Sequence, residues 1–161
     1  MYKYTPKPDR RPALLLSATL FIAALALFVP YNTDAAETLI FLRGMGTCAF
    51  VLGFIIADRF VFTLYSYAID ASDSGYEFTV HSVRYGRIRT VCRVTDEMIK
   101  DIYRYEAKRA RAEKIRKYNY CPEMSKKNRY SLYVDDGKAA FIFISPDETT
   151  VNIIKNIINR K

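Results

Sequence analysis

Two long apolar runs near the start of the chain, separated by a short polar loop, constrain the fold more than any other feature. The first run, Ala13–Val29, contains no charged residue, and with its flanks it approaches the ~20 residues that a helix needs to cross a bilayer. The second run is Thr38–Phe60. We therefore expect a transmembrane helical hairpin over residues 13–60, with spans at about residues 13–30 and 38–60.

Charged residues fix how the second span is placed. A charge at the middle of a bilayer is costly, so we expect Arg43 near the outer interface and Asp58 and Arg59 at the inner one. The stretch between them, Gly44–Ala57, is free of charge.

Small residues recur on one face of the second span, which allows another helix to approach closely. They are Gly46, Ala49, Gly53 and Ala57. We expect the first span to pack on this face within one molecule. The alternative is that the face recruits a membrane-protein partner or a second copy of the chain.

The charges around the spans predict their orientation. Basic residues precede the first span (Lys3, Lys7, Arg10 and Arg11), the loop carries only Asp34 and Glu37, and the remainder is basic, within a net charge of +8. The positive-inside rule therefore predicts a protein that crosses the cell membrane twice, with both termini in the cytoplasm. Residues 1–12 hold three prolines and are expected to be an unfolded, basic cytoplasmic arm. The alternative, a cleaved signal peptide, lacks a small-residue cleavage motif after Val29.

After the second span the apolar pattern changes to a period of two, which predicts strands. We expect strands at Phe60–Ile69, Tyr76–Val83 and Ile88–Val94, with turns at residues 70–75 and at Gly86. The alternation in the third strand predicts two faces. One is made of Ile88, Thr90 and Cys92, and the other of Arg87, Arg89, Val91 and Arg93.

The segment Thr95–Lys117 fits two interpretations. Its composition favours a helix with Thr95 as N-cap, whereas alternation favours strands at Ile99–Glu106 and Lys114–Cys121. We favour the two strands.

The end of the chain predicts a hairpin followed by a helix. Strands are expected at Arg129–Val134 and Ala139–Ile144 around an Asp-Gly turn. Ser145 is then the expected N-cap of an amphipathic helix, Pro146–Asn159, whose apolar stripe caps the sheet.

Three stretches carry a resemblance to a known family: TLYSYAIDASDSGYEFTV after the second span, YNYC at Tyr118–Cys121, and RYSLYVDDGKAAFIFISPDE before the last helix. In this order the chain resembles bacterial pleckstrin-homology-like (PH-like) membrane proteins. The resemblance implies an α+β membrane protein, in which the helical hairpin is followed at residues 61–161 by a cytoplasmic PH-like antiparallel β-barrel or sandwich of about seven strands, closed by the C-terminal helix. It also implies a non-catalytic domain that binds lipid, peptide or a neighbouring membrane protein. The charged segment Ala107–Lys117 departs from the family pattern.

The sequence offers little catalytic chemistry. A single histidine, His81, excludes a multi-histidine metal site, and no nucleotide-binding or metalloprotease motif occurs. The three cysteines, Cys48, Cys92 and Cys121, lack metal-ligand spacing and are expected to be structural. We therefore expect that the protein has no catalytic residue, no metal and no cofactor, and that it is not an enzyme.

The strongest positive signal is a cluster of basic residues from Lys100 to Arg129. We expect the basic surface between Arg84 and Arg129 to bind anionic lipid headgroups. The candidate lipid contacts are Arg104, Lys108, Arg109, Arg111, Lys114, Arg116 and Lys117. Positive charge that only sets topology and solubility is one alternative, and a protein-interaction scaffold is another. Nucleic acid is not an expected partner, because alternating tyrosines in strands ordinarily pack in the sheet.

Overall fold

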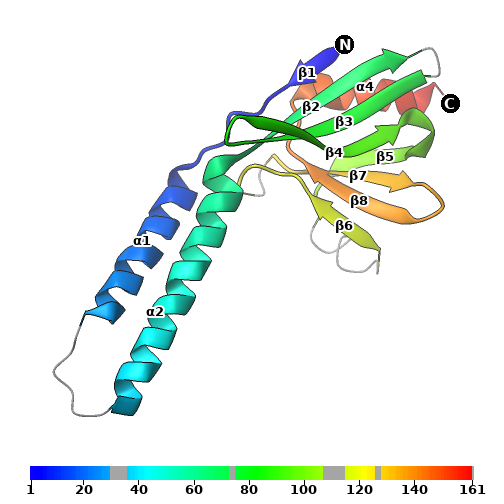
Figure 1. Cartoon of the computed structure of the whole chain (residues 1–161). Coiled ribbons are helices and arrows are strands. Elements are labelled where there is room, and N and C mark those ends of the chain that lie inside the picture. The colour runs from blue at the N-terminus through cyan, green and yellow to red at the C-terminus, as the bar shows by residue number, and fades with distance from the viewer. Residues whose placement is uncertain (30–35, 73–74, 107–114, 126–127, 161) are drawn as a thin grey trace. The chain divides into compact units, whose positions relative to one another are not determined.

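The computed structural model describes residues 1–29, 36–72, 75–106, 115–125 and 128–160 (Figure 1). The chain divides into two compact units. One is Asp9–Phe62, and the other joins Met1–Pro8 to Thr63–Lys161.

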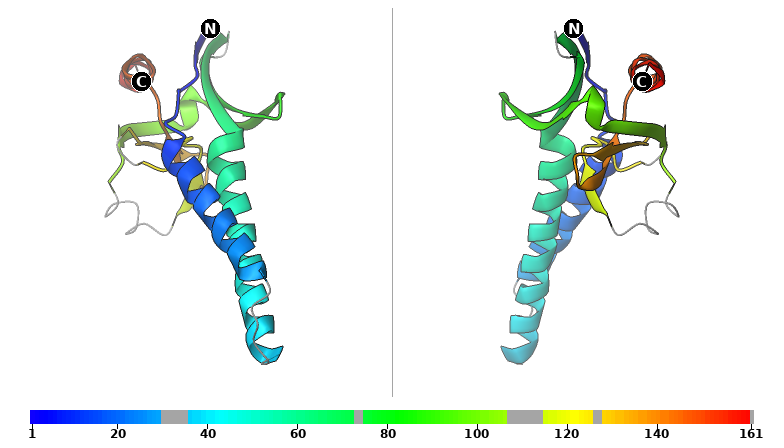
Figure 2. Two further views of the ribbon diagram at one scale, coloured as in Figure 1. Left: turned by 90° about the vertical axis from the view of Figure 1, so that its left-hand side faces the viewer. Right: turned by 90° about the vertical axis from the view of Figure 1, so that its right-hand side faces the viewer.

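The first unit is a pair of long apolar helices that lie side by side and antiparallel (Figure 2). Helix α1, Arg11–Phe28, has a proline in its first turn, where a missing N–H costs little. Helix α2, Ala36–Ala57, continues into a π-helical segment, Asp58–Phe62. Both are long and apolar enough to cross a membrane. Their few buried residues are small, so the large apolar side chains lie on the outside.

The second unit begins with a four-stranded antiparallel sheet in the order β1-β2-β3-β4. The strands are β1 at Tyr2–Tyr4, β2 at Thr63–Ser72, β3 at Gly75–Arg84 and β4 at Arg87–Thr95. The β2–β3 ladder extends to Ser72 and Gly75, beyond the expected strand ends. The predicted turn at residues 70–75 is therefore too long, because residues 70–72 and 75 belong to the strands; residues 73 and 74 lie outside the described residues.

A second four-stranded sheet follows in the order β5-β7-β8-β6. Its strands are β5 at Ile99–Arg104, β6 at Arg116–Asn119, β7 at Tyr130–Asp135 and β8 at Ala139–Ile144. Helix α4, Glu148–Asn159, completes the unit. The strand interpretation of the ambiguous segment is confirmed over β5 and β6, and a single 3-10 turn, rather than a long helix, precedes β5.

The expected antiparallel barrel or sandwich of about seven strands is only partly right. The described residues form eight strands in two separate sheets that do not close into a barrel, and β6 runs parallel to β8. Alternation identifies a strand, but it specifies neither its partner nor its direction, so these two features were not predictable from the pattern.

The expectation of an unfolded N-terminal arm is wrong for its first residues. Tyr2, Lys3 and Tyr4 pair with the middle of β2, and the Tyr4 ring stacks on Tyr67 at 6.4 Å between centroids. The Tyr2 hydroxyl also donates a hydrogen bond of 2.5 Å to Asp147 Oδ2. Ladder and side-chain contacts together offset the cost of ordering these few residues.

The N-cap of α4 is Asp147, not Ser145. The Asp147 carboxylate accepts hydrogen bonds from the backbone N–H of Thr150, at 3.0 Å, and from the Thr150 hydroxyl. Ser145 is buried, and its N–H donates to the Tyr67 hydroxyl at 3.0 Å, so it ends the buried part of β8 instead of starting the helix.

One apolar core joins both sheets and α4. Its buried members come from six strands and the helix: Tyr65, Tyr67, Ile69, Phe78, Val80, Val94, Ile99, Ile102, Leu132, Val134, Ala140, Ile142, Ile144, Val151, Ile154 and Ile157. A smaller cluster of Cys121, Phe141 and Phe143 covers the opposite face of β8. Strand β8 is therefore buried on both faces, as its unbroken apolar sequence AAFIFI indicates.

Candidate functional site

The turn of the β3–β4 hairpin is unusual because a tyrosine adopts a left-handed backbone conformation there. Arg84 pairs with Arg87 across a two-residue turn, in which Tyr85 has φ +49° and Gly86 has φ +74°. Turns of this kind favour Asn-Gly, and a left-handed non-glycine residue costs about 1–2 kcal/mol. The Tyr85 side chain is 66% exposed, with the Arg84 guanidinium carbon 5.3 Å from its ring centroid. An exposed aromatic group held at this cost marks the turn as a candidate binding element.

A β-bulge in β4 changes which side chains share a face. Val80 pairs with Cys92 but His81 pairs with Thr90, so Val91 is the extra residue. The predicted grouping of Thr90 with Cys92 is therefore wrong. Thr90 lies beside His81, and Cys92 lies opposite Val80 on the core side.

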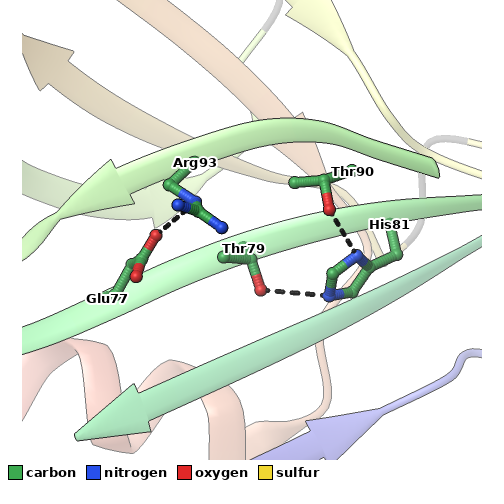
Figure 3. Close-up of polar contacts among 5 residues, drawn as sticks. All are labelled: Glu77, Thr79, His81, Thr90 and Arg93. Carbon is green, nitrogen blue, oxygen red and sulfur yellow. Dashed lines mark hydrogen bonds and ion pairs between the residues drawn. The ribbon is translucent and has the colours of Figure 1, made fainter. Parts of the chain in front are cut away.

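Figure 3 shows the outer face of these strands, on the side of Thr90. The His81 ring lies between two hydroxyls, with Nε2 at 3.2 Å from Thr79 Oγ1 and Nδ1 at 3.1 Å from Thr90 Oγ1. Arg93 Nε forms an ion pair of 2.6 Å with Glu77 Oε1. Both ring nitrogens of His81 are thus engaged by neutral side chains, and an exposed ion pair of this type contributes little stability.

Toward the turn, the core side of the hairpin becomes basic. Ser82 pairs with Arg89 and Arg84 with Arg87, and paired residues share a face. The face that buries Val80 therefore continues into a hollow of about 620 Å³, which we call the arginine hollow. It is lined by Ser82, Arg84, Tyr85, Arg87, Arg89 and Val91. Three of these described lining residues carry guanidinium groups, which favour an anion, and their planar donor sets suit phosphate.

A second hollow, the intersheet groove, lies between the edge strands β4 and β6 and has a volume of about 400 Å³. Core residues Val94, Val134, Ala140 and Ile142 reach into it, so its floor is apolar. Its other lining residues include three cations and one carboxylate, namely Arg93, Arg116, Lys138 and Asp136. Val91 lines both the arginine hollow and this groove, so the two hollows are neighbours along β4.

Tyr120 closes the groove beside Val91. Its hydroxyl donates to the Val91 carbonyl at 3.2 Å, and its ring packs against Tyr65 and stacks on Tyr118. The Tyr67 hydroxyl in turn donates to the Tyr120 carbonyl at 3.0 Å. The β4 bulge and the tyrosine after β6 are thereby held to the core.

Cys92 is a half-buried thiol in the groove wall. Burial raises the pKa of the Cys92 thiol to about 11. At neutral pH it is therefore overwhelmingly protonated and unreactive. None of the described residues forms a cluster of histidine, cysteine and acidic side chains suited to a metal ion.

The predicted lipid contacts are not all brought together. Lys108, Arg109, Arg111 and Lys114 lie outside the described residues. Arg104 is exposed on β5, at the opposite edge of the second sheet from β6, which carries exposed Arg116 and Lys117. Of these three, Arg116 lines the intersheet groove.

Arg129, included in the expected basic surface, is instead buried. Its exposed fraction is 9%, and its guanidinium carbon lies 5.3 Å from the Tyr105 ring centroid. The expectation was wrong here because sequence position does not show that a cation stacks on an aromatic ring inside the fold.

The predicted helix-packing face lies against α1 at both glycines. A Cβ on Gly46 would lie 3.1–3.3 Å from atoms of Phe28, Leu27 and Ala24, and one on Gly53 3.2–3.3 Å from Leu20 and Phe21. Ala57 is also buried, and Ala49 is half-buried. A partner helix would have to displace α1 to use this face.

Arg84, Arg87 and Arg89 were not among the predicted site residues. The signal was present, since three arginines flank the Tyr-Gly turn, but the expected alternation only grouped Arg87 and Arg89 with Val91 and Arg93 on one face of the strand. Comparison of the chain with protein-family profiles, with curated proteins and with solved structures found no match.

Proposed function

We propose that this protein is a membrane-anchored, non-enzymatic module whose β-domain binds the anionic surface of its own membrane through basic residues. The helices α1 and α2 supply the anchor. At 1.5 Å per residue, the 18 residues of the first helix are about 27 Å long, and the 27 residues of Ala36–Phe62 are about 40 Å long. The hydrocarbon core of a bilayer is ~30 Å thick. Their outward apolar side chains support insertion, since water would disfavour such a surface.

The pairing of β1 with β2 supports an even number of crossings. Strand β1 precedes the first apolar helix and β2 follows the second, yet both belong to one sheet. This pairing supports a topology in which both flanks of the hairpin lie on the same side of the membrane. The basic flanking residues favour the cytoplasm as that side, and a bacterial cell membrane is the proposed location.

The helical pairing also supports the placement of Arg43. Gly46 contacts Leu27 and Phe28 near the end of α1, and Arg43 lies one turn further toward the connecting loop. A cation at that level lies at the outer interface in the proposed orientation, where its side chain can reach headgroups.

The kinship with PH-like membrane proteins remains part of the proposal. Two sheets followed by a C-terminal helix on a shared core are consistent with it.

The observation that carries the proposal is the position of the arginine hollow. Arg84 pairs with Thr63, the first residue of β2, and Thr63 follows Phe62 directly in the sequence. Neighbouring strands are ~4.8 Å apart, so the backbone of Arg84 lies one strand spacing from the residue that follows the second apolar helix in the sequence. There, each cation can contribute about 1 kcal/mol of attraction to an anionic leaflet.

Native mass spectrometry of the full-length protein in detergent tests this function. Phosphatidylglycerol and phosphatidylcholine are added in turn, and bound lipids are counted. We expect phosphatidylglycerol adducts to predominate in the wild type. The variant R84Q/R87Q/R89Q should weaken their binding on the order of a hundredfold, because three interactions of about 1 kcal/mol are lost.

The matched control is K3Q/K100Q/K155Q, which removes three exposed cations from β1, β5 and α4. It should retain phosphatidylglycerol binding. Equal loss in both variants would show that net charge, and not the arginine hollow, governs binding, and that result would overturn the proposal.

A further inference from the structure

The arginine hollow and the intersheet groove differ in chemistry and are neighbours, since Val91 contributes to the lining of both. The first presents Arg84, Arg87 and Arg89, and the second has a floor of core residues. Each volume, about 620 and about 400 Å³, is of the size that holds a small molecule. Together they are cationic at one end and apolar at the other.

We propose that the two hollows form one site for a single anionic phospholipid, with its phosphate among the three arginines and one acyl chain in the intersheet groove. This inference rests on the proposed function and extends it from attraction to a surface to recognition of an individual lipid molecule. Arg116 and Lys138 on the groove lining add to the positive potential that favours an anionic amphiphile.

A peptide that adds a strand to β4 is the rival occupant, and the β4 bulge disfavours it. Strand addition needs a regular row of backbone groups at the sheet edge. Val91 interrupts the regular ladder of β4, and its carbonyl already accepts the Tyr120 hydroxyl. An acyl chain needs no such row and gains from the apolar floor formed by Val94, Val134, Ala140 and Ile142.

Cys92 in the groove wall provides a direct readout of occupancy. The full-length protein in nonionic detergent is treated with iodoacetamide at pH 9, and alkylation of each cysteine is followed by peptide mass spectrometry. Three probes are compared: dioctanoyl phosphatidylglycerol, dioctanoyl phosphatidylcholine, and glycerol 1-phosphate, which carries the phosphate without a chain. Glutathione added to the same sample is the reference for the reactivity of the reagent.

We expect dioctanoyl phosphatidylglycerol alone to slow alkylation of Cys92, by about tenfold when its concentration is ten times the half-saturating value. The variant R87Q/R89Q should alkylate at the wild-type rate without lipid, which shows an intact groove, and should lose the slowing when lipid is added.

Three results would overturn the inference. If phosphatidylcholine slows Cys92 alkylation equally, the arginines do not select the occupant. If glycerol 1-phosphate slows it equally, no acyl chain enters the groove. If no probe slows it, the groove does not bind lipid. Arginine-dependent phosphatidylglycerol adducts with an unchanged Cys92 rate would overturn this inference alone and leave the proposed function standing. Absence of such adducts would overturn both.

Discussion

Replacing Asp147 with alanine should destabilise the β-domain strongly, because one carboxylate serves three groups. It accepts from the Thr150 N–H, from the Thr150 hydroxyl and from the Tyr2 hydroxyl. Loss of an N-cap costs about 1 kcal/mol, and a buried hydroxyl that loses its partner costs at least about 1 kcal/mol more. Thr150 is fully buried, so water cannot replace the lost acceptor without rearrangement.

The expected loss for D147A is therefore about 2 kcal/mol, which lowers the midpoint of thermal unfolding by about 8–16 °C in a domain of this size. Near-ultraviolet circular dichroism of the full-length protein in detergent measures this midpoint. The signal comes largely from tyrosine, since the chain has thirteen tyrosines and no tryptophan. The control is E148A, which removes the adjacent exposed carboxylate. A midpoint for D147A no lower than that of E148A would refute the capping role.

The same carboxylate makes stability depend on pH. Burial by itself raises the pKa of Asp147, but the hydrogen bonds from Thr150 and Tyr2 outweigh it, so the pKa lies below its usual value. A lowered folded-state pKa contributes stability above the usual value of about 4, and this contribution is lost as the pH falls through the folded pKa. D147N retains a capping oxygen, so it should approach the wild type in stability below pH 4. A difference that stays constant from pH 7 to pH 3 would contradict this.

Three further predictions concern the turn, the thiol and the helical hairpin. Y85N should raise the thermal midpoint slightly, since asparagine adopts the left-handed conformation at lower cost, and a lowered midpoint would contradict the assigned strain. Alkylation of Cys92 by iodoacetamide should accelerate about tenfold per pH unit from pH 7 to 10, because its pKa is about 11; a plateau near pH 9 would contradict the burial of the thiol. G53L should lower the thermal midpoint of the helical hairpin, since overpacking costs about 1–3 kcal/mol, whereas G44L should not, because nothing lies within 4 Å of a Cβ at Gly44. Equal effects of the two leucines would refute the packing of α1 on Gly53.

Patterns that depend on neighbouring residues were predictable from the sequence. The period-two stretches located most of the strands, and the Asp-Gly turn located the last hairpin. The apolar stripe of the last helix was also evident, and Val151, Ile154 and Ile157 are its buried members. Two long apolar helices followed by sheets and a C-terminal helix are the part of the expected fold that the structure shows.

Features that depend on distant partners were not predictable. Strand β1 is only three residues long and becomes ordered through β2 and Asp147. The bulge at Val91 adds one residue, which reverses the faces of β4 and directs Arg87 and Arg89 into the same hollow as Arg84. Composition drew attention to the cations at residues 104–117 and not to those of the arginine hollow, since a charge count does not show which cations share a hollow.

Hydrogen–deuterium exchange of the full-length protein in lipid nanodiscs measures whether the arginine hollow binds anionic lipid in a bilayer. Discs of phosphatidylcholine alone are compared with discs that also contain phosphatidylglycerol, for the wild type and for R84Q/R87Q/R89Q. We expect amides of residues 82–92 to exchange more slowly only in the wild type and only in the anionic discs. Equal exchange of this hairpin in both kinds of disc, or protection that persists in the variant, would contradict this expectation.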